Sequence, residues 1–406
     1  MSILKQSVVY GFSNGLIAIS QFGMSLMFSK VLSTDGFGMY SLFLVCYMAF
    51  SMLNGMGLPA AVQRYYFEMN HEVFKILLST VIKAILYFSL LVALIILISP
   101  LSLSKYLLIE KKWILYSILT AMGQVFIQLI LIVLQSQKRL GNYLILVLLQ
   151  LFITVSASIA FFYYGVLTWQ LAVFAQSASP LLTGVVVIIF IIQDGNKINT
   201  WSTILFRKAI NYSFPLVPHQ LSSWIMTMAD RFIIGNFFGV GSVGVYSLSF
   251  QIAQSFNIVS NSLNQAVVPM LFQKLATPLP NLKEIKKINY FYLVSLCSFF
   301  LVFIVIFLQV SPYFITAEYK AVSQYTPLIF ISFLLLATSR IGSNYLMYHM
   351  KTKMLAIATI FSSILSISLN LILVPYFGPI AACWVSISSF LFLLILTTWY
   401  ACQIES

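Results

Sequence analysis

The amino-acid sequence predicts an all-α integral membrane protein, with twelve transmembrane helices in two six-helix lobes around a central cavity. The chain of 406 residues is 61% hydrophobic and 8% charged, whereas soluble domains carry about a quarter charged residues. Apolar stretches of about 20 residues, the length that crosses a bilayer as a helix, follow one another along the chain with short loops between them. Short motifs also recur at a spacing of half the chain.

The order of the elements follows from the apolar stretches. The expected spans are 8–29, 37–59, 76–99, 113–135, 142–163, 171–192, 209–235, 243–270, 291–310, 325–347, 354–374 and 378–400. Span 7 contains Pro215 and Pro218, which predict a break or kink in that helix. No loop is long enough to hold a soluble domain, and the chain has no Gly-x-x-x-x-Gly-Lys phosphate-binding motif. ATP hydrolysis by this chain is therefore disfavoured.

Basic residues are distributed unequally between the two ends of the spans. Odd-numbered loops hold five of the 22 lysines and arginines; these are Lys30, Lys105, Lys111, Lys112 and Lys320. Arg231 and Arg340 lie within spans, Lys83 lies in span 3 near its cytoplasmic end, and the others lie at the N-terminus or in even-numbered loops. The positive-inside rule then places both termini in the cytoplasm. The net charge of +13 fits attraction to anionic membrane lipids, and no basic groove for nucleic acid is expected because the charges are dispersed.

The two halves of the chain are copies. Residues 38–41 recur as 244–247, and 99–100 recur as 311–312; 163–165 recur as 376–378, and Lys138 recurs as Lys351. We expect an N-terminal lobe over 1–195, a cytoplasmic linker over 196–208 and a C-terminal lobe over 209–406. Six spans per copy give both lobes the same orientation, a parallel repeat whose substrate site is expected between the lobes.

Amide side chains inside the spans are candidates for that site, because buried polar groups need partners or water. At helical spacing, span 8 places six amides on one face: Gln251, Gln254, Asn257, Asn261, Asn264 and Gln265. Such a row either lines a wet cavity or bonds to neighbouring helices, and six amides favour the cavity. The candidate substrate-binding amides are Asn14, Gln21, Gln124, Gln128, Gln254, Asn257, Asn261 and Gln265.

Charged side chains add to this set. Arg340 lies within span 10 and should face the interior, since leaving it in lipid would cost about 2.5–3.5 kcal/mol. Asp230 and Arg231, near the end of span 7, form either a mutually neutralising local pair or part of the site, and Arg64 follows span 2 at its cytoplasmic end. The polar side chains inside the spans are mainly basic groups and amides, a set that suits an anionic, hydroxyl-rich substrate more than a lipophilic cation. The four cysteines have no metal-like spacing, and no metal site is expected.

The chain also resembles a known family. Residues 214–218, 229–235 and 241–247, with 32–41 and 55–59 in the first half, resemble bacterial polysaccharide flippases of the multidrug/oligosaccharidyl-lipid/polysaccharide exporter superfamily, in particular O-antigen translocases. The resemblance implies a MATE-like fold in the inner membrane. It also implies alternating access that moves oligosaccharide repeat units on undecaprenyl diphosphate from the cytoplasmic to the periplasmic leaflet.

The resemblance implies no enzymatic activity and no cofactor, and leaves open coupling to a proton or sodium gradient. Its expected partners are lipid-linked oligosaccharide, a polysaccharide polymerase and a chain-length regulator. A MATE-type multidrug/cation antiporter is the alternative, although such carriers rely on membrane carboxylates, and this chain offers Asp230 alone. Lipid II flippases carry arginines in the first span, which are missing here. A membrane polymerase or ligase would need a large loop with paired catalytic groups.

Overall fold

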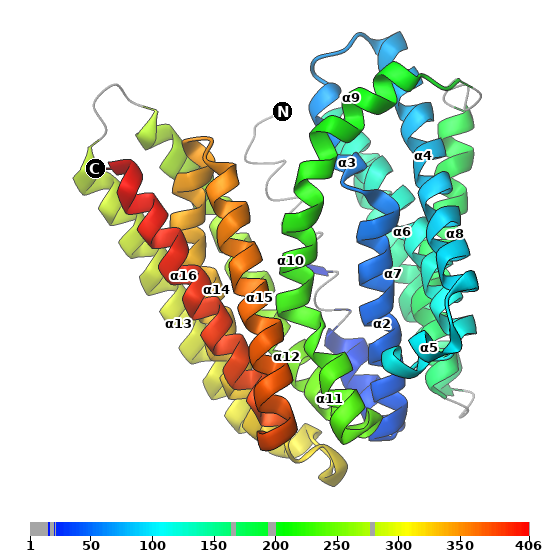
Figure 1. Ribbon diagram of the computed structural model, residues 1–406. Helices are drawn as coiled ribbons and strands as arrows, with labels where there is room; N and C mark the ends of the chain where they lie inside the picture. Colours follow the sequence, from blue (N-terminus) through cyan, green and yellow to red (C-terminus); the bar gives the residue numbers. More distant parts are fainter. Residues whose placement is uncertain are drawn as a thin grey trace. The chain divides into compact units, whose positions relative to one another are not determined.

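The computed structural model of the chain describes residues 15–16, 20, 22–163, 168–193, 200–276 and 281–405. Among these residues the regular structure is helical and no β-strand occurs (Figure 1). Nine helices of this described part are long and apolar enough to cross a membrane. The chain folds into two compact units. Unit 1 contains Gly36–Trp224, and unit 2 contains Ile225–Ser406 together with the segment that ends at Asp35.

Unit 1 is built from the following elements. They are α2 (Thr34–Gly55), α3 (Leu58–Tyr65), α4 (His71–Ile98), α5 (Leu101–Leu107), α6 (Lys111–Ser136), α7 (Leu140–Tyr163), α8 (Trp169–Gln193), α9 (Thr203–Ser213), η1 (Phe214–Leu216) and α10 (Val217–Met228) up to Trp224. The helices begin and end at local signals. Asn70 caps α4 by accepting a hydrogen bond from the Val73 amide at 2.9 Å, the role that suits an Asn side chain at this position. Gly57, at φ 68°, separates α2 from α3, and Pro59 follows at the start of α3, where its missing N–H costs nothing.

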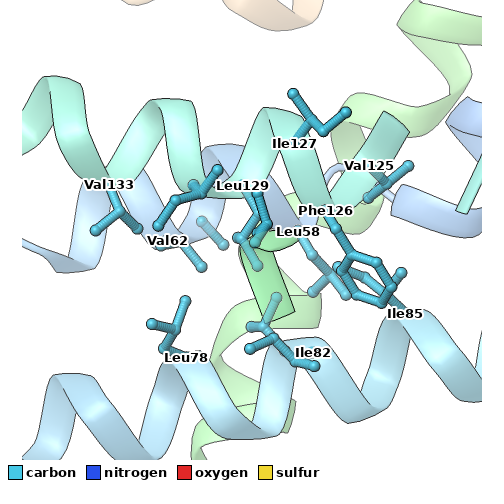
Figure 2. Close-up of a cluster of buried hydrophobic side chains, with 14 of the residues drawn as sticks. Leu58, Val62, Leu78, Ile82, Ile85, Val125, Phe126, Ile127, Leu129 and Val133 are labelled. Carbon is cyan, nitrogen blue, oxygen red and sulfur yellow. The ribbon is translucent and has the colours of Figure 1, made fainter. Parts of the chain in front are cut away.

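The apolar core of unit 1 lies where α3, α4 and α6 meet (Figure 2). Branched and aromatic side chains from the three helices pack against one another there: Leu58, Val62, Leu78, Ile82, Ile85, Val125, Phe126, Ile127, Leu129 and Val133. On another side, α6 approaches α8 so closely that a Cβ atom at Gly123 would lie 2.2 Å from the Pro180 carbonyl oxygen. Small residues allow this backbone approach in membranes, where packing rather than water exclusion drives association.

Unit 2 repeats the plan of unit 1. Its elements are α11 (Asp230–Phe238), α12 (Val240–Leu275), α13 (Leu282–Phe314), η2 (Ala317–Tyr319), α14 (Val322–Tyr348), α15 (Thr352–Phe377) and α16 (Pro379–Glu405). Three helix pairs of unit 1 have counterparts in unit 2: α4 packs on α6 as α13 packs on α14, α6 on α8 as α14 on α16, and α7 on α8 as α15 on α16. A Cβ atom at Gly342 of α14 would lie 2.6 Å from the Thr397 carbonyl oxygen of α16, so the close approach is repeated as well. The duplication predicted from the sequence is confirmed.

The predicted spans can be compared with the helices one by one. Nine of them coincide with apolar helices. Span 8 is α12, whose amides lower its mean hydropathy below that of the nine. Span 7 is broken as Pro215 and Pro218 predict, since α9 ends at Ser213, η1 follows, and α10 begins at Val217. Of span 1, the structure describes residues 15–16, 20 and 22–29.

The segment that the sequence assigns to a linker is partly helical. Ser202 caps α9 by accepting a hydrogen bond from the Leu205 amide, so the helix begins inside that segment. The chain before α9 is bound to α4: the Ser79 hydroxyl donates to the Thr200 carbonyl at 2.8 Å, and the Ser202 amide donates to the Thr80 hydroxyl at 3.2 Å. Residues 200–213 are therefore part of unit 1.

Candidate substrate-binding site

A row of hydrogen bonds joins α12 to α14 inside unit 2. The Arg340 guanidinium donates from Nη2 to Asn257 Oδ1 at 2.7 Å and from Nη1 to Ser260 Oγ at 3.0 Å. One turn further along α14, Asn344 Nδ2 donates to Asn264 Oδ1 at 2.9 Å. The partners advance together along both helices, so α12 and α14 run in the same direction. We call these five residues, with Gln254, the α12–α14 ladder.

Further polar groups support the ladder. Asn257 Nδ2 donates to Gln254 Oε1 at 3.3 Å, which leaves Asn257 Oδ1 turned toward the guanidinium. The Tyr292 hydroxyl of α13 donates to the Ala337 carbonyl at 3.0 Å, and the same hydroxyl oxygen lies beside Arg340. The guanidinium is thus fixed by neutral groups from two neighbouring helices.

The charge of Arg340 has no acidic partner in the described part of the chain, where no Asp or Glu oxygen lies within 4 Å of its nitrogens. The side chain is half-buried. A guanidinium has five N–H donors, and the bonds to Asn257 and Ser260 use two of them. A cation in a membrane helix costs free energy, and here neutral dipoles hold it while its net charge remains available to an anion.

The amides of α12 near the ladder differ in exposure. Gln254, Asn257 and Asn264 are half-buried, whereas Asn261 and Gln265 are exposed. In unit 1, Gln124 of α6 is half-buried and Gln128 is exposed. The predicted candidates Asn14 and Gln21 lie outside the described residues.

Asp230 and Arg231 form a buried ion pair, and each side chain is 3% exposed. Arg231 Nη1 donates to Asp230 Oδ1 at 2.8 Å and to the Thr227 carbonyl at 2.6 Å. The Tyr246 hydroxyl of α12 donates to Asp230 Oδ2, and the guanidinium lies 4.3 Å from the centre of the Phe250 ring. Both charges are therefore satisfied inside unit 2, and neither faces solvent.

Arg64 lies at the surface of unit 1, where α3 packs on α9. Its side chain is 52% exposed and its Nε lies 3.1 Å from Glu68 Oε1. The guanidinium also lies 4.7 Å from the centre of the Tyr212 ring. The hydrogen bond to Glu68 raises the pKa of Arg64 above its ordinary value, so this cation remains charged at every accessible pH.

Sequence reasoning did not select Ser260 and Tyr292, which complete the surroundings of Arg340. Ser260 could have been found, because it lies three residues after Asn257 and so shares its helix face. Tyr292 carries no such signal, since its position depends on how α13 packs against α14. Among the described residues, no group of His, Cys, Asp and Glu could hold a metal ion.

Comparison with known proteins agrees with this arrangement. A family model described as "Polysaccharide biosynthesis protein" matches residues 3–274, more than half of the chain. The chain belongs to this polysaccharide biosynthesis protein family. A second model, MatE, matches residues 215–372. The membership predicted from the sequence motifs is confirmed.

Two proteins of Haemophilus influenzae are similar over most of their length. One, an "Uncharacterized membrane protein", is 24% identical over 383 residues, which cover 90% of this chain and 89% of the relative. The other, "Lsg locus putative protein 1", is 22% identical over 398 residues, which cover 94% and 96% of the two chains.

Solved structures confirm the MATE-like fold. An inward-facing multidrug resistance MATE family transporter of the MOP superfamily gives a TM-score of 0.70 at 14% identity, covering 99% of this chain and 94% of that one. The lipid II flippase MurJ in an inward closed conformation gives 0.71 at 16% identity, with 100% and 88% covered. The MATE multidrug transporter DinF-BH also gives 0.71, at 14% identity, with 99% and 96% covered. The chain is therefore a multi-pass membrane protein of the transporter and flippase fold.

Proposed function

We propose that this protein is a flippase for oligosaccharide repeat units, of O-antigen or a similar surface polysaccharide, carried on undecaprenyl diphosphate. It moves them from the cytoplasmic to the periplasmic leaflet of the bacterial inner membrane by alternating access, and both its termini are cytoplasmic. The observation that carries the proposal is the half-buried Arg340, which no acidic group of the described residues neutralises. Membership of the polysaccharide biosynthesis family supports the substrate class.

Arg340 is the residue proposed to contact the diphosphate. A guanidinium presents its donors as a planar fork that matches phosphate oxygens in two parallel hydrogen bonds. Asn257 and Ser260 restrict the rotation of that fork, so less entropy is lost when an anion binds. The exposed amides Asn261 and Gln265 are proposed to bond sugar hydroxyls, because an amide can donate and accept.

The other predicted residues take secondary roles in this proposal. Arg64 is exposed and paired with Glu68, a position suited to first contact with an anionic headgroup. Gln124 and Gln128 are proposed to contact sugar, together with Asn14 and Gln21. We assign the Asp230–Arg231 pair a structural role, because its charges neutralise each other. Coupling to a proton or sodium gradient, and association with a polymerase and a chain-length regulator, complete the proposal.

The second candidate is a MATE-type multidrug or cation antiporter, which the MatE match over 215–372 favours. A carrier of lipophilic cations needs an acidic group that its substrate can approach. Asp230 is the acidic residue of the broken span 7, and its carboxylate already forms an ion pair with Arg231 and accepts a hydrogen bond from Tyr246. The balance of charge around Arg340 therefore favours an anionic substrate.

A complementation experiment separates the two functions. A strain that lacks the gene receives the wild type, Arg340→Gln or the control Lys320→Gln, which removes an exposed loop cation, each at the same protein level. The proposal expects surface polysaccharide to be restored by the wild type and the control, and lipid-linked intermediates to accumulate with Arg340→Gln. Normal surface polysaccharide with Arg340→Gln would exclude this residue from the site. Altered drug susceptibility with unchanged polysaccharide in the deletion strain would favour the antiporter.

A further inference from the structure

The helix α13 is longer than a membrane requires. It runs without interruption from Leu282 to Phe314, 33 residues. At about 1.5 Å per residue it is about 50 Å long, whereas the hydrocarbon core is about 30 Å thick. Its charged residues, Lys283, Glu284, Lys286 and Lys287, all lie in its first two turns, so we expect the surplus length at this end, with Leu282 to Tyr292 beyond the acyl chains.

Two opposite faces run along α13. One face is buried against α12 and α14 through Ile285, Tyr292, Leu296 and Phe307. The other face is exposed over the whole length of the helix. We call it the α13 stripe, and its residues are Lys283, Lys286, Lys287, Tyr290, Val294, Cys297, Leu301, Val305 and Leu308. At 100° per residue these positions lie within about 100° of arc.

The chemistry of the stripe changes in order along the helix. Three lysines come first, then Tyr290, which is 70% exposed, and then only apolar side chains and the thiol of Cys297. Lys287 lies about 10 Å from Val294 along the axis, because each residue adds about 1.5 Å. That interval matches the step from headgroup to acyl chain, and an aromatic ring at the boundary is typical of a membrane interface.

The lysine charges of the stripe are not neutralised within the described residues. The acidic residue on these turns is Glu284, and its carboxylate forms an ion pair with Lys274 of α12. Lys283, Lys286 and Lys287 form no ion pair with a described residue. A cluster of unpaired lysines beside a lipid-facing surface attracts anionic lipid at about 1 kcal/mol per residue.

We propose that the α13 stripe is a binding site for an anionic glycerophospholipid, with the headgroup phosphate on Lys283, Lys286 and Lys287. One acyl chain of this lipid lies along Val294, Leu301 and Val305. Along the stripe the charged groups come first and the apolar groups follow, as the phosphate and the acyl chain do in one phospholipid molecule. The positive charge of the lysines is opposite to that of the phosphate. The site is independent of the ladder residues and of the proposed transport function.

Cys297 gives a local probe of this site, because it lies on the stripe and is exposed. In a Cys402→Ser background the other two cysteines, Cys46 and Cys383, are buried. A small fluorophore on Cys297 of the full-length protein in neutral detergent micelles would then report lipid through quenching by brominated acyl chains. Titrations with brominated phosphatidylglycerol and brominated phosphatidylcholine give the two apparent affinities.

The proposal expects stronger quenching by phosphatidylglycerol than by phosphatidylcholine. Lys283→Gln/Lys287→Gln should weaken the affinity for phosphatidylglycerol about 25-fold, which is about fivefold for each lysine. The matched control Lys351→Gln/Lys353→Gln removes two exposed charges from the adjoining loop and the start of α15, and should change it less than about twofold.

Three results would overturn the proposal. The first is equal quenching by the two lipids, and the second is an equal loss of affinity in the two double variants, which would indicate general electrostatic attraction without a site. The third is displacement of phosphatidylglycerol by an equimolar amount of undecaprenyl diphosphate, which would assign the stripe to the polyprenyl carrier. Unchanged elution on gel filtration and unchanged circular dichroism exclude misfolding of the variants.

Discussion

Replacing Asp230 by Asn tests whether the buried ion pair holds unit 2 together. The substitution keeps the size of the side chain and removes its charge. Arg231 is 3% exposed and would then be a buried cation without a counter-charge. It would keep its bond to the Thr227 carbonyl and its place over the Phe250 ring.

The magnitude follows from the burial of both partners. Removing one member of a buried pair costs about 3–5 kcal/mol, because the remaining charge is left uncompensated. The retained carbonyl and aromatic contacts of Arg231 place Asp230→Asn at the lower end, at about 3 kcal/mol. For a unit of this size, each kcal/mol shifts the melting temperature by about 2–4 °C, so we expect a fall of about 6–12 °C.

The assay is thermal unfolding of the purified protein in detergent at one fixed scan rate, since such transitions are often irreversible. Asp230→Asn/Arg231→Gln should recover most of the loss, because removing both charges leaves no buried ion. The matched control is Glu68→Gln, which breaks the exposed pair with Arg64; an exposed pair contributes about 0–1 kcal/mol. An unchanged melting temperature for Asp230→Asn, or a double variant less stable than the single one, would refute the reasoning.

Three further predictions concern the packing of unit 2 and the ladder. Gly342→Ala would place a Cβ atom 2.6 Å from a backbone carbonyl of α16 and should destabilise the protein by about 1–3 kcal/mol in thermal unfolding. At Gly141 a Cβ atom would meet no other part of the structure within 4 Å, so Gly141→Ala should not destabilise it. Asn257→Leu removes one of the acceptors that hold the guanidinium, and should reduce polysaccharide export at a protein level matched to the wild type; normal export would remove Asn257 from the ladder's function. Tyr319→Phe removes the hydroxyl that bonds to the carbonyls of Leu32 and Ser33 at 3.2 and 3.3 Å, and should lower the free energy of unfolding by about 0.5–1.5 kcal/mol. Amide hydrogen exchange at the start of α2, which follows these two residues, should become faster, and unchanged exchange would contradict this role.

Most of the fold is readable from the sequence, because the bilayer fixes both the length and the apolarity of its helices. Span 7 is the clearest local success, since Pro215 cannot continue a regular helix and α9 ends two residues before it. The start of α9 was missed because a basic, polar segment between two lobes is typical of a linker. Ser202 was the available signal, as a residue that commonly caps helices.

The site was only partly predictable. An arginine inside a span must face protein or water, so the interior position of Arg340 followed from sequence alone. Its partners Ser260 and Asn257 did not, because the sequence does not state the register between α12 and α14. The pairing of Asp230 with Arg231 is one of the two interpretations that the sequence left open, and the structure shows the pair; the sequence could not choose between them, since neighbouring residues on a regular helix do not face each other.

The central claim is that Arg340 provides the charge that receives the diphosphate of the substrate. The most direct measurement is the affinity of undecaprenyl diphosphate, without sugar, for the purified wild-type protein and for Arg340→Gln. Hydrogen bonds to a charged group are worth about 1.5–3 kcal/mol, so we expect the affinity to fall about 10- to 150-fold. Lys320→Gln, which removes an exposed loop cation, should leave it unchanged. Equal affinities for the wild type and Arg340→Gln, with both proteins folded, would contradict the account.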